Sequence, residues 1–491
     1  MKKNLLALFL LLCVSVFAQN SGFVKEMVPD LSIGRLDVKG ALLPDSSFIV
    51  FGGHTPGFII SNTAERWKEG QAAWAVKTMT DFRDCSAIVR LDDNRIMLAG
   101  GMSSNLGVGQ LVSTELFDAT TNTFTSKANM NIARTLFRGA LLANGKALFV
   151  GNWYNDASLA EVYNPQTNEF SLTNPVVTQR SCSYVIPRSN NGAIIMGGFT
   201  PYGGNIESIE LYDYASNSFS AFRNTLFENE SGWIYNIYAP SGTFMPEDHT
   251  LDGKFYMSAY KDNGNQGTQY MVFSIDPDSI LIRPIITNTR LLTYNVNAND
   301  SINFALSSNF FMDKKLKKIY FWGNNVNKNS NGNFGMALYS YDIKTKEIIE
   351  PTAFENFSYF AASGGGCILP NGKLLAAGGN YTSNFDAHPH CFIANPTNSI
   401  NAIQEVKIND NGLNIFSNTR QNVLNISYSG TTSGIYTLKI YNTDGRCVRN
   451  QKINLYEGIN NISIDASNLA RGIFLVQLSG QNTTATKKFI R

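Results

Sequence analysis

Short apolar runs, each ended by glycine or polar turn residues, follow one another along most of the chain. Residues 134–152 (RTLFRGALLANGKALFVGN) contain two such runs, which flank an Asn-Gly pair and end at Gly151. Two apolar runs joined by such a pair are typical of a β-hairpin. The pattern therefore predicts an all-β fold of short antiparallel strands joined by tight turns.

Copies of this hairpin recur with a period close to 50 residues. Four copies have an arginine 17 positions before a glycine, at Arg35/Gly52, Arg83/Gly100, Arg134/Gly151 and Arg180/Gly197. A second glycine follows in three of them, and Asn152 replaces it in the third copy. A second motif has an aromatic residue nine positions after a glutamate, which is Glu65, Glu115, Glu161 or Glu210. Because spacing varies only between the motifs, each unit is predicted to contain four strands with a variable loop after the second.

Three weaker units follow, with strand pairs around residues 251–280, 317–348 and 367–396. The last unit lacks a fourth strand, whereas residues 23–27 (FVKEM) form a strand that belongs to no unit. A terminal strand that completes the last sheet would remove the exposed edges of an open ring. We therefore predict a seven-bladed β-propeller over about residues 22–398, closed by its N-terminal strand.

The glycine pair, the glutamate motif and the later aromatic residue together resemble kelch repeats of the bacterial and galactose-oxidase-like kind. The resemblance covers about three-quarters of the chain and implies a kelch-type propeller. The fifth and sixth units depart from it, because they lack the glycine pair, the arginine and the glutamate.

Both ends of the chain predict export. Residues 1–18 have a basic start, an apolar stretch and small residues at Val16 and Ala18, as in a signal peptide cleaved before Gln19. Cys13 lies inside the apolar stretch and is interpreted as a spacer rather than an acylation site. No later segment is long and apolar enough to cross a bilayer, so we expect no transmembrane span in the mature chain.

After a linker at residues 399–410, alternating apolar positions in residues 411–491 predict a small β-sandwich. Its motifs are Tyr441 before Asp-Gly-Arg at 444–446, Gly-Ile-Asn at 458–460, Leu469 before Gly472, and Lys487-Lys488. These motifs resemble the type A C-terminal sorting domain of the type IX secretion system of Bacteroidetes. The resemblance implies the type IX machinery as a partner, and a secreted or surface-held protein whose sorting domain is removed or acts as an anchor. The alternative is an ordinary carbohydrate-binding-like sandwich.

Net charge and cysteine content exclude some classes of partner and a disulfide-based fold. The net charge is +2 without blocks of like charge, so nothing indicates nucleic acid or an anionic membrane as a partner. Five cysteines remain after the signal peptide, too few and too scattered for a disulfide framework, and Cys367 with Cys391 is the one pair worth testing.

The four repeated arginines have two interpretations. They are expected at one face, beside the variable loops, where guanidinium groups could bind the carboxylate of an acidic sugar or peptide. Alternatively, each arginine pairs with a neighbouring acid or carbonyl and fastens the fold, as residues fixed by a repeat usually do. Trp153 and Tyr154 could stack on a sugar ring. The glutamates are expected to cap backbone amides.

A metal centre has weak support. Asp386, His388 and His390 crowd into one loop next to Cys391, without a distant further ligand. The chain has four histidines and no Tyr-His pair, which is unlike the copper-radical oxidases of this fold. We therefore expect no catalytic residues of that kind, no metal and no other cofactor.

These observations favour a binding module for an extracellular glycan or protein over an enzyme. The main alternative is a metal-independent carbohydrate-active enzyme, similar to sialic-acid mutarotases, that uses the arginines. A purely structural surface protein is the third possibility.

Overall fold

The structure is a computed structural model that describes residues 23–490 apart from several segments. The undescribed positions are 1–22, 105–108, 155–156, 201–202, 228–230, 236–244, 263–267, 287–309, 329–333, 347, 355–363, 380–386, 397–412, 419–422, 431–432, 443–446, 466–468, 470–472, 481–483 and 491. The signal peptide at 1–18, the linker at 399–410 and Asp386 therefore lie outside the described residues. Contacts divide the chain into one compact unit of Ser21–Pro396 and another that contains Thr397–Arg491.

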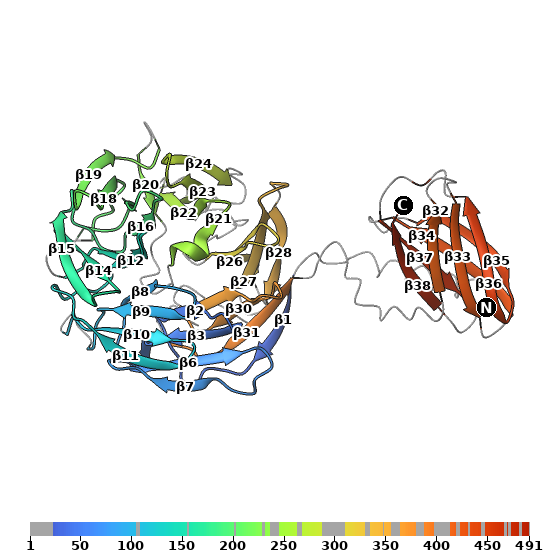
Figure 1. Ribbon diagram of the computed structural model, residues 1–491, viewed down its shortest axis with the longest axis horizontal. Helices are drawn as coiled ribbons and strands as arrows, with labels where there is room; N and C mark the ends of the chain where they lie inside the picture. Colours follow the sequence, from blue (N-terminus) through green and yellow to red (C-terminus); the bar gives the residue numbers. More distant parts are fainter. Residues whose placement is uncertain are drawn as a thin grey trace. The chain divides into compact units, whose positions relative to one another are not determined.

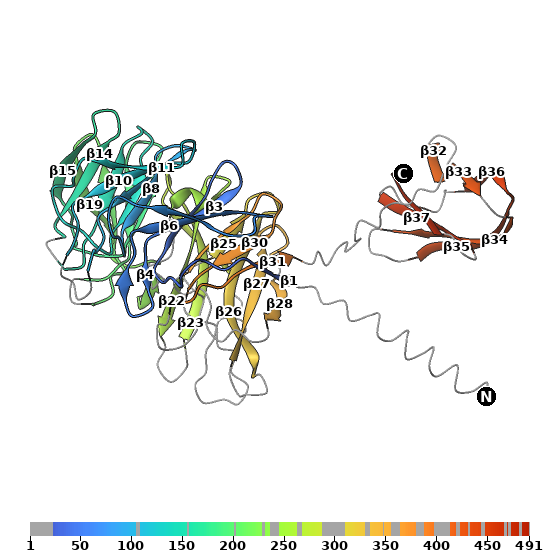
Figure 2. The ribbon, with the colours of Figure 1, turned by 90° about the horizontal axis from the view of Figure 1, so that it is seen from below.

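The unit Ser21–Pro396 consists of antiparallel sheets that follow one another around it in a propeller-like manner (Figures 1 and 2). Among the described residues there are seven main sheets, numbered here in chain order. Sheet 1 contains β2 (Lys39–Leu42), β3 (Ser47–Phe51), β6 (Thr63–Lys68) and β7 (Ala75–Thr78), with a side hairpin of β4 (His54–Thr55) and β5 (Ile59–Ile60). Sheet 2 contains β8 (Ala87–Arg90), β9 (Arg95–Ala99), β10 (Thr114–Asp118) and β11 (Thr123–Lys127).

The next two sheets repeat this strand order. Sheet 3 contains β12 (Arg138–Leu141), β13 (Ala147–Val150), β14 (Leu159–Asn164) and β15 (Glu169–Pro175). Sheet 4 contains β16 (Tyr184–Pro187), β17 (Ala193–Met196), β18 (Ile209–Asp213) and β19 (Ser218–Arg223). The hairpin predicted for residues 134–152 is confirmed, with Arg138 opposite Val150 and Leu141 opposite Ala147. Its first strand begins at Arg138 rather than Arg134, because Leu136 has a left-handed backbone (φ 53°) that no strand accommodates.

The remaining three sheets are less regular. Sheet 5 contains β20 (Trp233–Tyr235), β21 (Thr250–Leu251), β22 (Lys254–Asp262), β23 (Thr268–Asp276) and β24 (Leu281–Ile286). Sheet 6 contains β25 (Phe310–Asp313), β26 (Lys318–Lys328), β27 (Phe334–Asp342) and β28 (Ile348–Phe354). Sheet 7 contains β29 (Gly365–Ile368), β30 (Leu374–Ala377), β31 (Cys391–Pro396) and β1 (Phe23–Val28). The spare N-terminal strand thus pairs with β31, from Phe23 opposite Pro396 to Val28 opposite Cys391.

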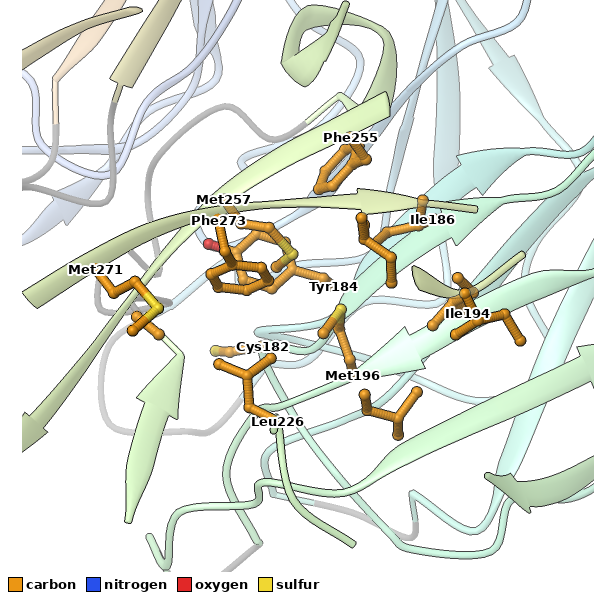
Figure 3. Packing of buried hydrophobic residues seen from close by; sticks show 14 of the residues in the cluster. Cys182, Tyr184, Ile186, Ile194, Met196, Leu226, Phe255, Met257, Met271 and Phe273 are labelled. Atoms are coloured by element: carbon orange, nitrogen blue, oxygen red, sulfur yellow. The ribbon is translucent and has the colours of Figure 1, made fainter. Parts of the chain in front are cut away.

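Neighbouring sheets pack through apolar side chains. Figure 3 shows this between sheet 4, which contributes Tyr184, Ile194 and Met196, and sheet 5, which contributes Phe255 and Met257. All five side chains are at most 5% exposed. Full burial of such a side chain contributes about 1.5–3 kcal/mol. The sheet faces therefore form the cores that hold the loops between them in place.

A short 3₁₀ helix, η1 (Pro246–His249), precedes β21 and packs against strands of sheets 4, 5 and 6. It contacts β16, β22 and β25, while the preceding Met245 is fully buried against Leu43 of sheet 1 and Ile88 of sheet 2. This segment connects the first and second strands of sheet 5. It therefore lies on the face opposite to the connections between second and third strands.

The unit of Thr397–Arg491 contains two described antiparallel sheets. One has β32 (Leu413–Asn418), β33 (Val423–Gly430) and β36 (Gly458–Asp465), and the other has β34 (Gly434–Tyr441), β35 (Cys447–Leu455), β37 (Ile473–Ser479) and β38 (Thr484–Ile490). Alternate residues such as Tyr436, Leu438 and Ile440 are buried in one apolar cluster with Leu424 and Ile426 of the other sheet. This arrangement is a small β-sandwich.

Two further expectations concern single features. All five cysteines after residue 22 are free thiols, so Cys367 and Cys391 form no disulfide in this structure. In the part of the chain that the structure describes, no helix has the length and apolar character needed to span a membrane.

Candidate functional site

Each of the four repeated arginines forms an ion pair with the glutamate of its own unit. Nε–Oε1 distances are 2.9 Å for Arg35–Glu65 and 3.1 Å for Arg134–Glu161. Arg83 pairs with Glu115, and Arg180 pairs with Glu210. All eight side chains are at most 1% exposed. Buried charges of this kind persist only when they are paired and hydrogen-bonded.

The interval of 17 residues has a direct cause in these contacts. Nη1 of each arginine donates to the carbonyl oxygen of the glycine 17 positions later, at 2.8–3.0 Å. The arginine therefore binds the end of the second strand of its own sheet. The paired glutamate accepts a hydrogen bond from the amide three positions before the arginine, at Ser32, Thr80, Asn131 and Val177. The expectation that the glutamates cap backbone amides is confirmed.

In three of the four glycine pairs, the second residue connects neighbouring sheets. Its amide donates to the carbonyl of the next arginine, at 2.9 Å from Gly53 to Arg83 and 2.8 Å from Gly101 to Arg134. The same bond runs from Gly379 of sheet 7 to Arg35 before sheet 1, also at 2.9 Å. Contact is so close that a Cβ on Gly52 would lie 2.2 Å from the Arg83 carbonyl oxygen. Glycine is therefore required by packing as well as by its positive φ.

In the third unit, Asn152 replaces the second glycine and keeps the hydrogen bond between neighbouring sheets. Its amide still donates to the Arg180 carbonyl at 3.0 Å. Its side-chain Oδ1 accepts from the Thr135 amide at 3.2 Å, and its Nδ2 donates to the Ala133 carbonyl at 2.9 Å. The Asn152 side chain thus supplies hydrogen bonds to the backbone around Arg134, where the other units form hydrogen bonds between two backbone segments.

These contacts decide how the arginine motif is interpreted. An arc of exposed guanidinium groups was expected if Arg35, Arg83, Arg134 and Arg180 bind a ligand. The structure instead buries all four among glutamate and carbonyl oxygens. A carboxylate ligand would have to displace a carboxylate that is already in place. The structure therefore favours the alternative, in which the arginines fasten the fold.

The two aromatic candidates lie in different environments. The Trp153 ring packs edge-on against Phe199, with centroids 6.2 Å apart, beside the core between sheets 4 and 5. Tyr154 is 52% exposed. Tyr154 is therefore available to a ligand, whereas Trp153 acts mainly in packing.

Tyr154 is one of six large apolar or aromatic side chains that gather on one face. The six are 42–66% exposed and comprise Ile33, Phe58, Ile59, Phe82, Tyr154 and Val177. Each lies either before the first strand of a sheet or between the second and third strands. Because successive strands run in opposite directions, these connections emerge on the same face. We call these six residues the loop face.

A buried polar cluster beneath this face was not anticipated from the sequence. Asp37, Cys85, Leu136 and Cys182 each follow a repeated arginine by two positions, and all four have positive φ angles of 52–58°. At the first two of these positions, Asp37 and Cys85 lie near Asp84 and His54.

Two cations adjoin the cluster. Lys39 of β2 and Arg138 of β12 are 2% and 5% exposed. Burial, followed by the charge of Arg138, lowers the pKa of Lys39 to about 8 despite opposing effects of Cys85, Asp37 and Asp84. Burial acts to lower the pKa of His54, but Asp84 and Asp37 outweigh it and the net shift is upward.

The predicted metal candidate is only partly assembled. The rings of His388 and His390 lie 3.6 Å apart, as expected for alternate residues of an extended segment. However, His390 Nδ1 pairs with Asp30 at 2.7 Å, and His388 Nδ1 accepts the His390 amide at 3.0 Å. Burial and the neighbouring His390 lower the pKa of His388 to about 4. Among the described residues, the three whose ligand atoms lie close enough together to hold one ion are instead Asp37, Asp84 and Cys85.

Comparison with known protein families identifies the C-terminal unit. Residues 414–491 match the family described as the secretion system C-terminal sorting domain. The C-terminal region is a type IX sorting domain. The protein is therefore exported by the type IX system, either to the cell surface or into the medium.

The rest of the chain is similar to known proteins in fold alone. No curated protein matches the chain. A fungal alcohol oxidase of the AA5 family, solved in complex with copper, matches with a TM-score of 0.50 at 15% identity. The match covers 95% of this chain and 99% of that chain. It supports a propeller-like fold.

Proposed function

We propose that residues 22–398 form a seven-bladed kelch-type propeller, followed by the sorting domain. The seven described sheets and the pairing of β1 with β31 support this. So does the Gly379–Arg35 hydrogen bond, because it repeats at the junction of sheets 7 and 1 the contact that joins sheets 1 and 2. The repeated Arg–Glu–Gly network supplies the kelch-type character.

We further propose that the exported propeller is a binding module for an extracellular glycan or protein. The loop face carries this proposal, because exposed side chains such as Phe58, Ile59 and Tyr154 lie on connections that emerge on one face and differ between units. Exposed apolar side chains that share one face are typical of an interaction site. The aliphatic members Ile33, Ile59 and Val177 favour a protein, whereas Phe58, Phe82 and Tyr154 would also stack on sugar rings.

The test compares two variants of the mature protein. In the first variant, Phe58→Ser combined with Ile59→Ser removes the apolar side chains from the tip of the β4–β5 hairpin. The control, Leu316→Ser, changes a residue that is 39% exposed between β25 and β26, on the opposite face. Binding to a glycan array and to the isolated outer surface of bacterial cells is then measured. We expect the loop-face variant alone to lose binding. Equal binding by both variants and the wild type would refute the role of this face.

The burial of the arginines argues against the alternative of a metal-independent carbohydrate enzyme. It required the arginines to contact an acidic sugar, and Arg134 and Arg180 are fully buried beside Glu161 and Glu210. Conversion of an acidic sugar between its anomers, followed by NMR with the wild-type protein, tests this alternative directly.

A further inference from the structure

Side chains capable of binding a metal meet at the junction of sheets 1 and 2. Asp37 precedes β2, His54 begins β4, and Asp84 and Cys85 lie between β7 and β8. His54 Nδ1 lies 3.0 Å from Asp84 Oδ2 and 3.7 Å from Asp37 Oδ2. One ligand atom from each of Asp37, Asp84 and Cys85 lies within 4.8 Å of the other two. Two oxygens and one sulfur are therefore close enough to share one ion, and the His54 nitrogen lies beside the two carboxylates.

These separations suit a small four-coordinate ion. Zinc binds oxygen and nitrogen at about 2.0–2.2 Å and sulfur at about 2.3 Å, so the ligand atoms of a tetrahedral site lie about 3.3–3.8 Å apart. The distance from His54 Nδ1 to the Asp37 oxygen falls in this range, and its distance to the Asp84 oxygen is slightly shorter. To complete the shell, the Cys85 sulfur and the His54 ring would have to rotate toward the two carboxylates.

The cluster is also buried and incompletely hydrogen-bonded. The side chains of Asp37, His54 and Asp84 are 15%, 11% and 6% exposed, and Cys85 is 5% exposed. His54 directs Nδ1 toward the two carboxylates, while its buried Nε2 has no hydrogen-bond partner. Because Nε2 lies on the other side of the ring from the carboxylates, an ion in this cluster would be bound through Nδ1.

The repeat provides an internal comparison. At the junction of sheets 2 and 3, the positions of His54, Asp84 and Cys85 are occupied by Met102, Thr135 and Leu136. The backbone is nearly the same there, with φ 53° at Leu136 and 52° at Cys85. The fold therefore does not require ligand-type side chains at these positions.

We infer that Asp37, His54, Asp84 and Cys85 bind one divalent transition-metal ion of the zinc class, a role beyond the proposed binding function. Imidazole and thiolate ligands favour zinc over magnesium or calcium. On binding, the S–H bond of Cys85 breaks and its proton leaves to solvent, while His54 gives up the Nδ1 proton that it shares with Asp84 and carries its remaining proton on Nε2. Metal–sulfur and metal–nitrogen bonds then form. Two carboxylates and a thiolate exceed the charge of the ion by one, and the neighbouring cations Lys39 and Arg138 offset this excess.

The experiment uses the full mature protein after treatment with a chelator. Zinc is titrated calorimetrically, and cobalt is added separately so that a thiolate–cobalt absorption band reports sulfur coordination. We expect one ion per chain and a clear thiolate band. Asp37→Asn and Cys85→Ser should each weaken binding by more than about 100-fold, since loss of a direct ligand exceeds the effect of outer contacts.

Two control variants should bind zinc as the wild type does. Cys182→Ser changes the residue at the position equivalent to Cys85 before sheet 4, and His390→Gln removes the pair with Asp30. The inference fails if the wild type takes up no zinc at equimolar concentration. It also fails if cobalt binds without the thiolate band, or if a control variant loses zinc as fully as Cys85→Ser. Because the wild-type titration and spectrum need no variant, the test survives a ligand variant that does not fold.

Discussion

Replacement of Arg134 by methionine tests whether the repeated arginine is a structural residue. In the structure the Arg134 guanidinium donates to Glu161, to the Gly151 carbonyl at 2.9 Å and to the Leu159 carbonyl at 2.8 Å. A methionine side chain fills much of the volume of the arginine side chain and makes none of these hydrogen bonds. The Glu161 carboxylate would then be buried with its charge uncompensated, held only by neighbouring amides such as that of Asn131.

Loss of one partner of a buried ion pair costs about 3–5 kcal/mol. A unit as large as Ser21–Pro396 has an unfolding entropy of roughly 0.8 kcal/mol per degree at its midpoint, so about 4 kcal/mol lowers Tm by about 5 °C. Differential scanning calorimetry measures this shift directly. Adding Glu161→Gln to Arg134→Met should recover part of the loss, because the uncompensated charge is removed.

The matched control is Arg95→Met. Arg95 pairs with Asp92 while both side chains are more than 40% exposed, so its loss should cost below about 1 kcal/mol. A shift for Arg134→Met no larger than that for Arg95→Met would refute the structural role. Loop-face binding by the folded Arg134→Met protein should be unchanged, since Arg134 is fully buried.

Three other changes have defined outcomes. Deletion of Phe23–Val28 exposes the edge of β31, so Tm should fall and proteolysis of the propeller should accelerate, whereas Met27→Ser, which keeps the strand and changes a side chain that is 52% exposed, should change neither. Gly198→Ala places a Cβ 2.3 Å from the Ser181 carbonyl oxygen and should destabilise the protein several times more than Gly203→Ala, where the Cβ is free and only a positive φ costs about 1–2 kcal/mol. Burial, aided by Lys314, lowers the pKa of His249 to about 4, so the unfolded chain binds its proton first. The contribution of His249 to stability should therefore fall by up to roughly 3 kcal/mol between about pH 6.5 and 4. It is measured as the difference between the wild type and His249→Gln, because burial raises the pKa of the neighbouring Glu247 to about 7 and that group contributes in the opposite direction.

Local patterns predicted the strands well because each hairpin is specified within a few residues. The Asn-Gly turn and the apolar runs around Arg134 appear as β12 and β13, with the turn at Gly145 in a positive-φ conformation. The starts of first strands were less predictable. Leu136 and Cys182 adopt left-handed backbones because inter-sheet bonds hold them there, as when the Cys182 amide donates to the Leu136 carbonyl at 2.7 Å. Such conformations depend on neighbouring sheets, which local patterns do not report.

The role of the arginines was ambiguous for a different reason. An arginine that binds a ligand and an arginine that stabilises its own sheet would both recur once per unit at a constant spacing. One signal separates them: the fifth and sixth units lack the arginine and the glutamate together. Residues that disappear as a pair are expected to bind one another, as Arg134 and Glu161 do. No comparable signal marks the cluster of Asp37, His54 and Asp84, because its members meet only when sheets 1 and 2 pack.

The buried arginine network also explains how the loop face can vary. Glu161 follows Asn152 by nine positions, whereas Glu115 follows Gly101 by fourteen, yet both glutamates reach their arginines. In both units the arginine binds the glycine carbonyl before the loop and the glutamate after it. The two ends of the loop are therefore fixed by groups that the loop does not supply. A change at Phe58 or Tyr154 should thus alter recognition with little effect on stability, which is the property that a binding face needs.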